Sequence, residues 1–548
     1  MTVPVTSSGN AGRGDNRKAV VLSAAVLMLV LLVSITVRIR LLAAPFERDE
    51  GEHATMAQTV LSGHAPWQLA YNMKLPGTDA AYAVILALFG QTATAVRLGL
   101  LLLNIATIFL IARLGKDLFG TAGGNVAGGA YGVLTFSQNV FGTIAHSTHF
   151  VAFFASLAVL LLWRSDFRAG RVFVAGVVFG MAFLMKQPGI AFAFFGAVWL
   201  IWRWRDRRTT ATEGLRVIAL FFGGVLLPYA SLCLLLWKAG VFGRFWFWTV
   251  TLARAYAGQL SLSTQIQYFQ LNFPRVVGPN IFLWMLALLG IATTCWNPAT
   301  RRGGFLTGAL LAFSFLAVCA GGVFNPHYFI MMFPALALAC GAWAAALGQG
   351  ASVPGKSTSG NSFADVALVV MFGFACLYSV YEQRDYLFSM TPLEFSRNTY
   401  GLNPFPEAEQ VGEYIRLHSE PQARVAVLGS EAEIYFYSDR QPATGYLFTY
   451  GLMETHQYAA PSQDEMIDEI LRSRPEYIVY VGVPASWLQR PGSAQTIFYW
   501  FADYVPRHYD VVGAVDLVHG EPTRYIWGSE AASHQPASPA YLTVYRRR

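Results

Sequence analysis

The sequence predicts a polytopic α-helical membrane protein of about 11 spans with a C-terminal extracytoplasmic α/β domain. Of its 548 residues, 54% are hydrophobic and only 13% are charged, which is unlike an ordinary soluble protein. Apolar runs fill most of the chain up to Tyr381, and polar residues are much denser beyond it. The chain therefore divides into a membrane part and a soluble part.

Apolar runs long enough to cross a bilayer as helices define the membrane part. The first, over residues 20–37, carries no charge and is too long for a signal peptide, so we expect it to remain as the first span. The predicted spans lie near residues 20–40, 92–112, 121–141, 146–163, 171–186, 189–202, 216–237, 280–296, 304–322, 328–347 and 364–381.

Basic residues in the short loops predict the orientation. With the N-terminus inside, the inner loops contain Arg113, Lys116, Arg164 and Arg203, whereas the outer turns 142–146 and 322–327 contain no Lys or Arg. This bias predicts a multi-pass protein of the cytoplasmic (inner) membrane with a cytoplasmic N-terminus. It also accounts for the net charge of +7, so we expect no nucleic-acid partner.

The same orientation predicts the domain layout. Residues 1–19 form a cytoplasmic tail, and residues 20–382 form the transmembrane domain with external loops 43–91 and 238–279. Residues 383–548 form the extracytoplasmic domain. Its helices are expected over 407–417, 464–471 and 494–504, and its strands over 424–428, 434–437, 477–481, 510–518 and 541–545. This alternation predicts a small, partly parallel α/β domain.

The first external loop carries the densest set of acidic residues. Asp49 opens a short amphipathic helix that stops at Gly63, and the spacing Asp49-x-x-Glu52 is also a capping box. Spacing alone favours a cap. However, Asp49 and Glu50 sit together at a membrane exit, where two carboxylates repel each other and are poorly solvated, which favours a catalytic Asp49. Glu50 is a second acid, a metal ligand or a solvated neighbour, and the sequence does not separate these.

The segment Arg48-Asp49-Glu50-Gly51-Glu52, with Ala54 and then Lys74-Leu75-Pro76, resembles the first external loop of a membrane glycosyltransferase family. These are the GT-C type enzymes related to protein O-mannosyltransferases and aminoarabinose transferases, which use polyprenyl-phosphate sugars. Two positions depart from the family pattern: His53 stands where an aromatic residue is usual, and Leu75 stands where a second Pro is common.

The resemblance implies substrate contacts at several cations and aromatic residues. Lys74 is either an interfacial lysine that snorkels or a phosphate contact near Tyr71. Lys186 is a lysine at membrane depth, which is a functional hypothesis by default, although snorkelling would suffice at the predicted outer end of its span. The family often shows a lysine in a similar K-Q-P setting, which favours function. His327 and Tyr328 match a His-Tyr pair of the family at an outer span end, although a lone His there more often packs. We interpret His146 and His149 as packing residues.

The function that follows from the resemblance is inverting transfer of a hexosyl or pentosyl group from a polyprenyl-phosphate donor on the outer face. The acceptor is a lipid, glycan or protein that offers a hydroxyl group, and Asp49 is the general base. Lys74, Lys186 and Arg254 stabilise the charge of the leaving phosphate. These cations make a cofactor unnecessary. A divalent metal on Asp49, Glu50, His53 and His327 is possible, but no ligand spacing supports it.

Two other classes of function remain open on the sequence. A transporter or flippase for a lipid-linked or anionic substrate would use Asp49 and Lys186 as coupling charges, but transporters keep such charges near the bilayer midplane. In a non-catalytic assembly subunit, Asp49 would be only a helix cap.

Overall fold

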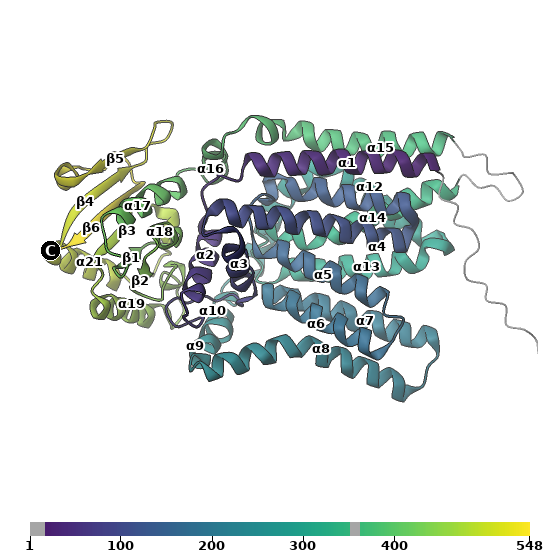
Figure 1. Cartoon of the computed structure of the whole chain (residues 1–548), viewed down its shortest axis with the longest axis horizontal. Helices are drawn as coiled ribbons and strands as arrows, with labels where there is room; N and C mark the ends of the chain where they lie inside the picture. The colour runs from purple at the N-terminus through teal and green to yellow at the C-terminus, as the bar shows by residue number, and fades with distance from the viewer. Residues whose placement is uncertain (1–16, 351–361) are drawn as a thin grey trace, which may run out of the picture.

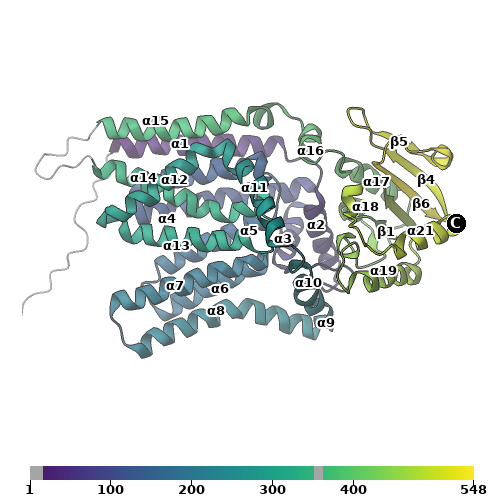
Figure 2. The same ribbon diagram turned by 180° about the vertical axis from the view of Figure 1, so that it is seen from behind.

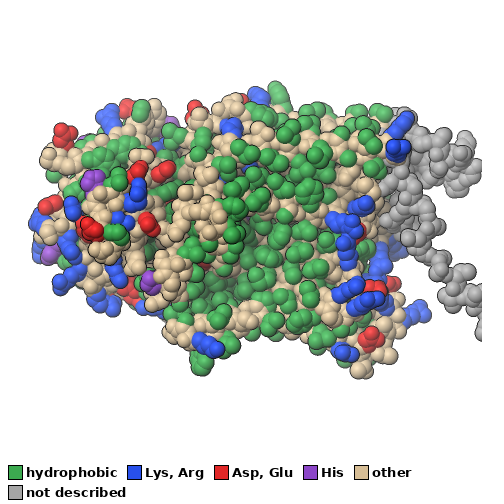
Figure 3. All heavy atoms as spheres, in the orientation of Figure 1, with side chains coloured by type: hydrophobic (Ala, Val, Ile, Leu, Met, Phe, Trp, Pro, Cys, Tyr) green, Lys and Arg blue, Asp and Glu red, His purple; other side chains and the backbone are tan. Residues whose placement is uncertain are grey.

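A bundle of apolar helices carries a mixed α/β domain at one end in the computed structural model, which describes residues 17–350 and 362–548 (Figure 1). Most of the expected N-terminal tail lies outside the described residues. Hydrophobic side chains cover the visible side of the bundle, and Lys and Arg gather at the end opposite the α/β domain (Figure 3). This distribution is typical of a membrane-spanning bundle with one basic end.

The helices of the bundle follow the predicted spans. They are α1 (Arg17–Arg40), α4 (Ala93–Phe136), α5 (Ser147–Trp163), α6 (Ala169–Met185), α7 (Ile190–Arg207), α8 (Ala211–Lys238), α12 (Ile281–Trp296), α13 (Pro298–Cys319), α14 (Phe333–Gly350) and α15 (Ser362–Glu382). Helix α4 bends at Gly120, whose φ of 85° is left-handed, and this kink separates two predicted spans. Among the described residues, six helical stretches are long and apolar enough to cross a membrane, so the count of eleven spans stays a prediction.

Short helices fill the two predicted external loops at the end of the bundle next to the α/β domain. The first loop contains α2 (Arg48–Leu61) and α3 (Gly77–Phe89). The second contains α9 (Phe242–Trp246), a π-helical turn η3 (Phe247–Leu252), α10 (Ala253–Ala257) and α11 (Leu262–Val277). Figure 2 shows α10 and α11 at this end of the bundle from behind. The loops therefore lie where the two parts of the molecule meet.

The C-terminal domain is built on a six-stranded mixed sheet. Its strands are β1 (Arg424–Leu428), β2 (Gln441–Pro442), β3 (Tyr477–Val481), β4 (Tyr509–Asp516), β5 (Arg524–Trp527) and β6 (Tyr541–Arg547), in the order β2-β1-β3-β6-β4-β5. Strands β2, β1 and β3 are parallel, and the other pairs are antiparallel. Its helices are α16 (Pro392–Tyr400), α17 (Phe405–Leu417), α18 (Glu433–Ser438), α19 (Ala459–Ser473), α20 (Pro484–Trp487) and α21 (Thr496–His508). The expected partly parallel α/β domain is confirmed.

One predicted strand is wrong. Residues 434–437 belong to the helix α18, which packs between α17 and α2. Ile434, Tyr435 and Phe436 are all buried, so the helix meets protein on more than one side. A short apolar run of this kind has no periodicity that distinguishes a strand from a buried helix.

Candidate active site

Helix α2 begins with a capping box that does not involve Asp49. The N-cap is Glu47, whose side chain accepts a hydrogen bond from the Glu50 N–H at 2.9 Å, while the Glu50 carboxylate lies 3.4 Å from the Glu47 nitrogen. Asp49 is already inside the first turn of the helix. The interpretation of Asp49 as the cap is therefore wrong, and its carboxylate is free for other partners.

Lys74 joins Asp49 and Glu52 across the first loop. Its Nζ lies 2.8 Å from Asp49 Oδ1 and 2.6 Å from Glu52 Oε2. Burial disfavours the charge on Asp49, but Lys74 and then His146 outweigh burial and hold the pKa of Asp49 well below its ordinary value. Burial likewise opposes the charge of Lys74, whose pKa is nevertheless raised because Asp49 and Glu52 stabilise the ammonium. Asp49 is therefore ionised at neutral pH.

Two stacked imidazoles complete the surroundings of Asp49. His146 Nδ1 lies 3.7 Å from Asp49 Oδ2 and 3.8 Å from Glu47 Oε1. The rings of His146 and His327 are parallel to within 12°, with centroids 4.0 Å apart. The interpretation of His146 as a packing residue missed this contact. His149, one turn further along α5, is buried as expected.

Glu47 and Asp49 are neighbouring carboxylates in different electrostatic states. Burial raises the pKa of Glu47, and His146 only partly compensates, whereas Lys74 and His146 hold the pKa of Asp49 low. Two carboxyl groups whose surroundings push their pKa values apart are the arrangement expected for an acid and a base at one site. No pattern in the sequence marked Glu47 as a site residue.

Asp49, His146 and His327 also form a set of side chains that fits a divalent cation. One ligand atom from each residue lies within 4.8 Å of the others. Within the described part of the chain, His146 Nε2 and His327 Nδ1 are buried without a hydrogen-bond partner. One carboxylate and two imidazoles are a donor set common for divalent transition metals. A bound cation would act as a Lewis acid and stabilise negative charge on a bound substrate group. Glu50 and His53, which the sequence left open as ligands without support from their spacing, do not belong to this set.

Lys186 approaches the same region from the break between α6 and α7. Its Nζ lies 4.3 Å from the centroid of the Tyr328 ring, and its side chain is largely buried. Burial lowers the pKa of Lys186 to about 8, and Asp49 and Lys74 are among the charges that act on it. The next residue, Gln187, donates a hydrogen bond to the Met73 carbonyl at 2.6 Å. The K-Q-P turn is thereby fastened beside Lys74.

Glu50 faces away from Asp49 into the protein. Its carboxylate is fully buried and lies 2.6 Å from Arg97 Nη2 of α4. It also accepts a hydrogen bond from the Ala145 N–H at 2.8 Å. The interpretation of Glu50 as a solvated neighbour is therefore wrong, and these contacts favour a structural role. An arginine within an apolar run was the signal for such a partner, because a charge at that depth requires one.

Three contacts from α2 and α3 hold the segment that presents His146. Glu50 accepts from the Ala145 nitrogen, and the Tyr82 hydroxyl donates to the Ala145 carbonyl at 2.8 Å. His53 Nε2 lies 3.0 Å from Ser147 Oγ, and its Nδ1 lies 2.5 Å from Asp79 Oδ1. All of these side chains are buried. The residue that departs from the family pattern, His53, therefore fixes the start of α5 beside His146.

The remaining predicted residues lie apart from Asp49. The Tyr71 hydroxyl donates to Glu469 of the C-terminal domain at 2.6 Å, and its ring packs at 5.4 Å from that of Trp248. Arg254 is exposed on α10. Within residues 17–350 and 362–548, no hydrogen bond or ion pair joins its side chain to the Asp49 cluster, which consists of Asp49 and its neighbours Glu47, Glu52, Lys74, His146, Lys186 and His327. The structure thus brings together Asp49, Lys74, Lys186, His327 and Tyr328.

The C-terminal domain covers α2 directly. Arg48 pairs with the buried Glu431 at 2.6 Å, and a Cβ at Gly51 would lie 2.6 Å from the Glu433 nitrogen. Tyr71 forms a parallel β-bridge with Tyr446. The cluster is therefore enclosed between the bundle and the C-terminal domain.

A helix bundle whose acidic first loop lies beneath a C-terminal α/β domain is the arrangement expected for the class of GT-C type membrane proteins. Residues 74–230 match a family model described as dolichyl-phosphate-mannose-protein mannosyltransferase. No curated protein matches the chain in a sequence comparison.

Solved structures of this class share the fold. ArnT from Cupriavidus metallidurans bound to undecaprenyl phosphate is 17% identical, with a TM-score of 0.58 over 96% of this chain and 97% of that one. The Archaeoglobus fulgidus oligosaccharyltransferase in its apo form is 12% identical, with a TM-score of 0.54 over 92% of this chain and 74% of that one. These matches confirm the expected resemblance to GT-C type proteins in fold, while the family model, which begins at Lys74, does not include the acidic segment of the first loop.

Proposed function

We propose that this protein transfers a sugar from a polyprenyl-phosphate donor to a hydroxyl group of an acceptor at the outer face of the cytoplasmic membrane, with inversion. The observation that carries the proposal is the ionised Asp49 held by Lys74 beside His146, at the end of the helix bundle. A polyprenyl tail is soluble only in the bilayer, so its phosphate reaches the protein at such a boundary. A transporter would instead keep its charges near the middle of the bundle.

The reaction is a single displacement at the anomeric carbon. The acceptor oxygen forms a bond to this carbon as the bond to the donor phosphate oxygen breaks. The hydroxyl proton passes to Asp49, and polyprenyl phosphate leaves with the electron pair. Lys186, beside Tyr328, stabilises the charge that develops on the leaving phosphate.

Lys74 couples donor binding to the basicity of Asp49. In the free protein Lys74 keeps the pKa of Asp49 low, which makes the carboxylate a weak base. A donor phosphate competes with Asp49 and Glu52 for the Lys74 ammonium. As Lys74 turns to the phosphate, the pKa of Asp49 rises, so that the base becomes effective only when the donor is present.

The test is Asp49→Asn in the full chain, assayed by transfer of labelled sugar in membranes at equal protein abundance. Asn cannot accept the proton, so transfer should fall by roughly 100- to 10,000-fold. Because Glu47 caps the helix, α2 should remain intact, and the variant should still bind polyprenyl-phosphate sugar. The control is Asp503→Asn on the exposed face of α21, which should be fully active. Near-normal transfer by Asp49→Asn contradicts the proposed function.

A further inference from the structure

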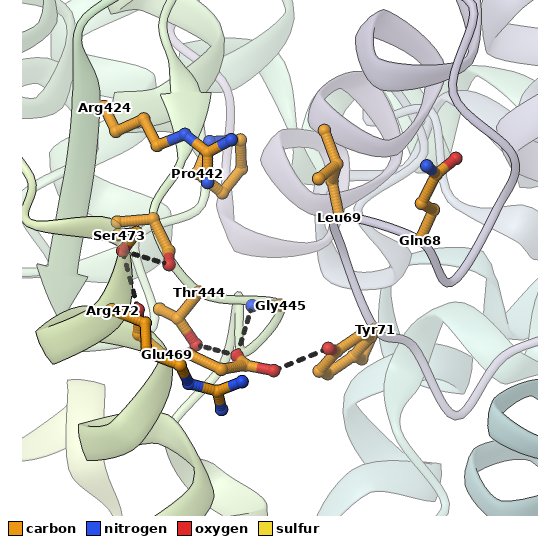
Figure 4. Close-up of a pocket in the computed structure, with 11 residues that line it drawn as sticks. Gln68, Leu69, Tyr71, Arg424, Pro442, Thr444, Gly445, Glu469, Arg472 and Ser473 are labelled. Carbon is orange, nitrogen blue, oxygen red and sulfur yellow. Dashed lines mark hydrogen bonds between the residues drawn. The ribbon is translucent and has the colours of Figure 1, made fainter.

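A cavity lies between the first external loop and the edge of the C-terminal sheet (Figure 4). Its volume is about 260 Å³. Gln68, Leu69 and Tyr71 line it from the loop, and the end of β2 and part of α19 line it from the domain. Arg424 and Arg472 extend from the domain side towards the loop. The first external loop and the C-terminal domain thus form a cavity that is large enough for a small ligand and is separate from the Asp49 cluster.

The carboxylate in this cavity already has a full set of partners. Glu469 accepts hydrogen bonds from the Tyr71 hydroxyl at 2.6 Å, the Thr444 hydroxyl at 2.8 Å and the Gly445 N–H at 2.9 Å. Arg244 lies 3.8 Å from the same carboxylate and compensates its charge from outside the cavity. Glu469 is therefore a structural tie between the two walls and does not neutralise the cavity arginines.

The two arginines supply unpaired positive charge. Arg472 donates from Nε to the Asp468 carbonyl at 3.1 Å, which leaves its terminal nitrogens available. Neither Arg424 nor Arg472 forms an ion pair with any carboxylate of the described residues. Gln68 adds an amide group, whose oxygen is already bonded to the Ala65 N–H. A cavity with two guanidinium groups and a free amide N–H is rich in donors, and this chemistry favours phosphate or carboxylate groups.

We propose that this cavity binds an anionic group, a phosphate or a carboxylate, of a saccharide acceptor. The proposal rests on the proposed function, because it assigns the cavity to the acceptor. Tyr71 in its wall is three residues before Lys74, so the first external loop supplies residues both to this cavity and to the Asp49 cluster. The proposed function assigns the donor phosphate to Lys74 and Lys186. Arg424 and Arg472 are separate from these lysines and are therefore available for the acceptor. The volume suits a sugar-sized group more than a large ligand.

The experiment measures binding of small probes to the full chain in nanodiscs of zwitterionic lipid. The probes are glucose 6-phosphate and glucuronate, with glucose as the neutral comparison. The two anions should bind and glucose should not. Arg424→Ala and Arg472→Ala should each raise the Kd at least about tenfold, since a charge-assisted hydrogen bond contributes about 1.5–3 kcal/mol. Arg507→Ala on exposed α21 is the matched control and should leave the Kd unchanged.

The possible results distinguish a saccharide site from a lipid-headgroup site and from a cavity without anion preference. If glucose and glucuronate bind equally well, the proposed anion site is refuted. Unchanged binding of the anions by the double variant Arg424→Ala/Arg472→Ala refutes it as well. Loss of probe binding in nanodiscs that contain phosphatidylglycerol, at constant ionic strength, shows that a lipid headgroup occupies the cavity and overturns the saccharide assignment. Asp49→Asn should bind the anions normally. Probe binding therefore tests the cavity independently of the reaction. Sugar transfer by Asp49→Asn tests only the proposed function.

Discussion

At the scale of single residues, the ammonium of Lys74 lies between two carboxylates, 2.8 Å from Asp49 and 2.6 Å from Glu52. It therefore controls the proton affinity of the proposed base. Because Lys74 is a principal cause of the low pKa of Asp49, its removal should raise that pKa. The same two ion pairs hold the Lys74 side chain in place in the protein without a bound donor.

Lys74→Ala should move the acid limb of the kcat/KM profile to higher pH. The base form of Asp49 is lost as pH falls through its pKa, so a raised pKa makes activity disappear at a higher pH. Lys74→Arg keeps the charge and should leave the limb near that of the unmodified protein, with altered geometry lowering the rate. The measurement is labelled-sugar transfer across pH. An acid limb that does not move in Lys74→Ala contradicts this control of Asp49.

Lys186 should determine the alkaline limb of the pH profile of sugar transfer. Burial lowers its pKa to about 8, so the cation is present below this value and is lost as pH rises through it. Transfer by the unmodified protein should fall above about pH 8, and Lys186→Ala should lower kcat about 100-fold even at neutral pH. Lys186→Arg should retain activity at higher pH because a guanidinium does not deprotonate there. An identical alkaline limb in Lys186→Arg would rule out Lys186 as its cause.

At the scale of elements, α2 has one face in the candidate site and another in the protein interior. Glu50→Ala should destabilise the protein by about 3–5 kcal/mol, because Arg97 keeps a buried charge without its partner. The remaining folded molecules should transfer sugar far better than Asp49→Asn does. Thermal unfolding and transfer per folded molecule are the measurements, with Glu413→Ala on exposed α17 as the control. Unchanged stability with abolished transfer would instead make Glu50 a catalytic group.

The spacing of apolar residues along the chain predicted the helices and strands that bury one face only. The limits of β1 and β3 agree with the sequence analysis, and α2 ends just before Gly63 as expected. The very short strand β2 and the buried helix α18 carry no such pattern. His146 was missed because its partner Asp49 is distant in the chain, and only the tertiary fold brings α2 to the start of α5. Candidate residues are thus visible in the sequence, whereas their pairing depends on the tertiary fold.

At the scale of the whole molecule, the basic end of the bundle and the C-terminal domain lie at opposite ends (Figure 3). From the positive-inside rule we expect the C-terminal domain and the Asp49 cluster to lie outside. A reporter active only in the cytoplasm and fused near Ser396 should stay silent, while a fusion at Arg208 should be active. Activity at Ser396 would change the number of spans by one and move the proposed reaction to the other face.

The contact of Arg48 with Glu431 also has a consequence for biosynthesis, because 383 residues of chain separate the two partners. At about 5–20 residues per second, a ribosome needs roughly 20 to 80 s after adding Arg48 before it adds Glu431. During that interval the nascent chain has its Asp49 loop but lacks the wall supplied by Glu431, Glu433 and Tyr446. We therefore expect a chain truncated before Glu431 to insert its helices but to lack this wall of the candidate active site.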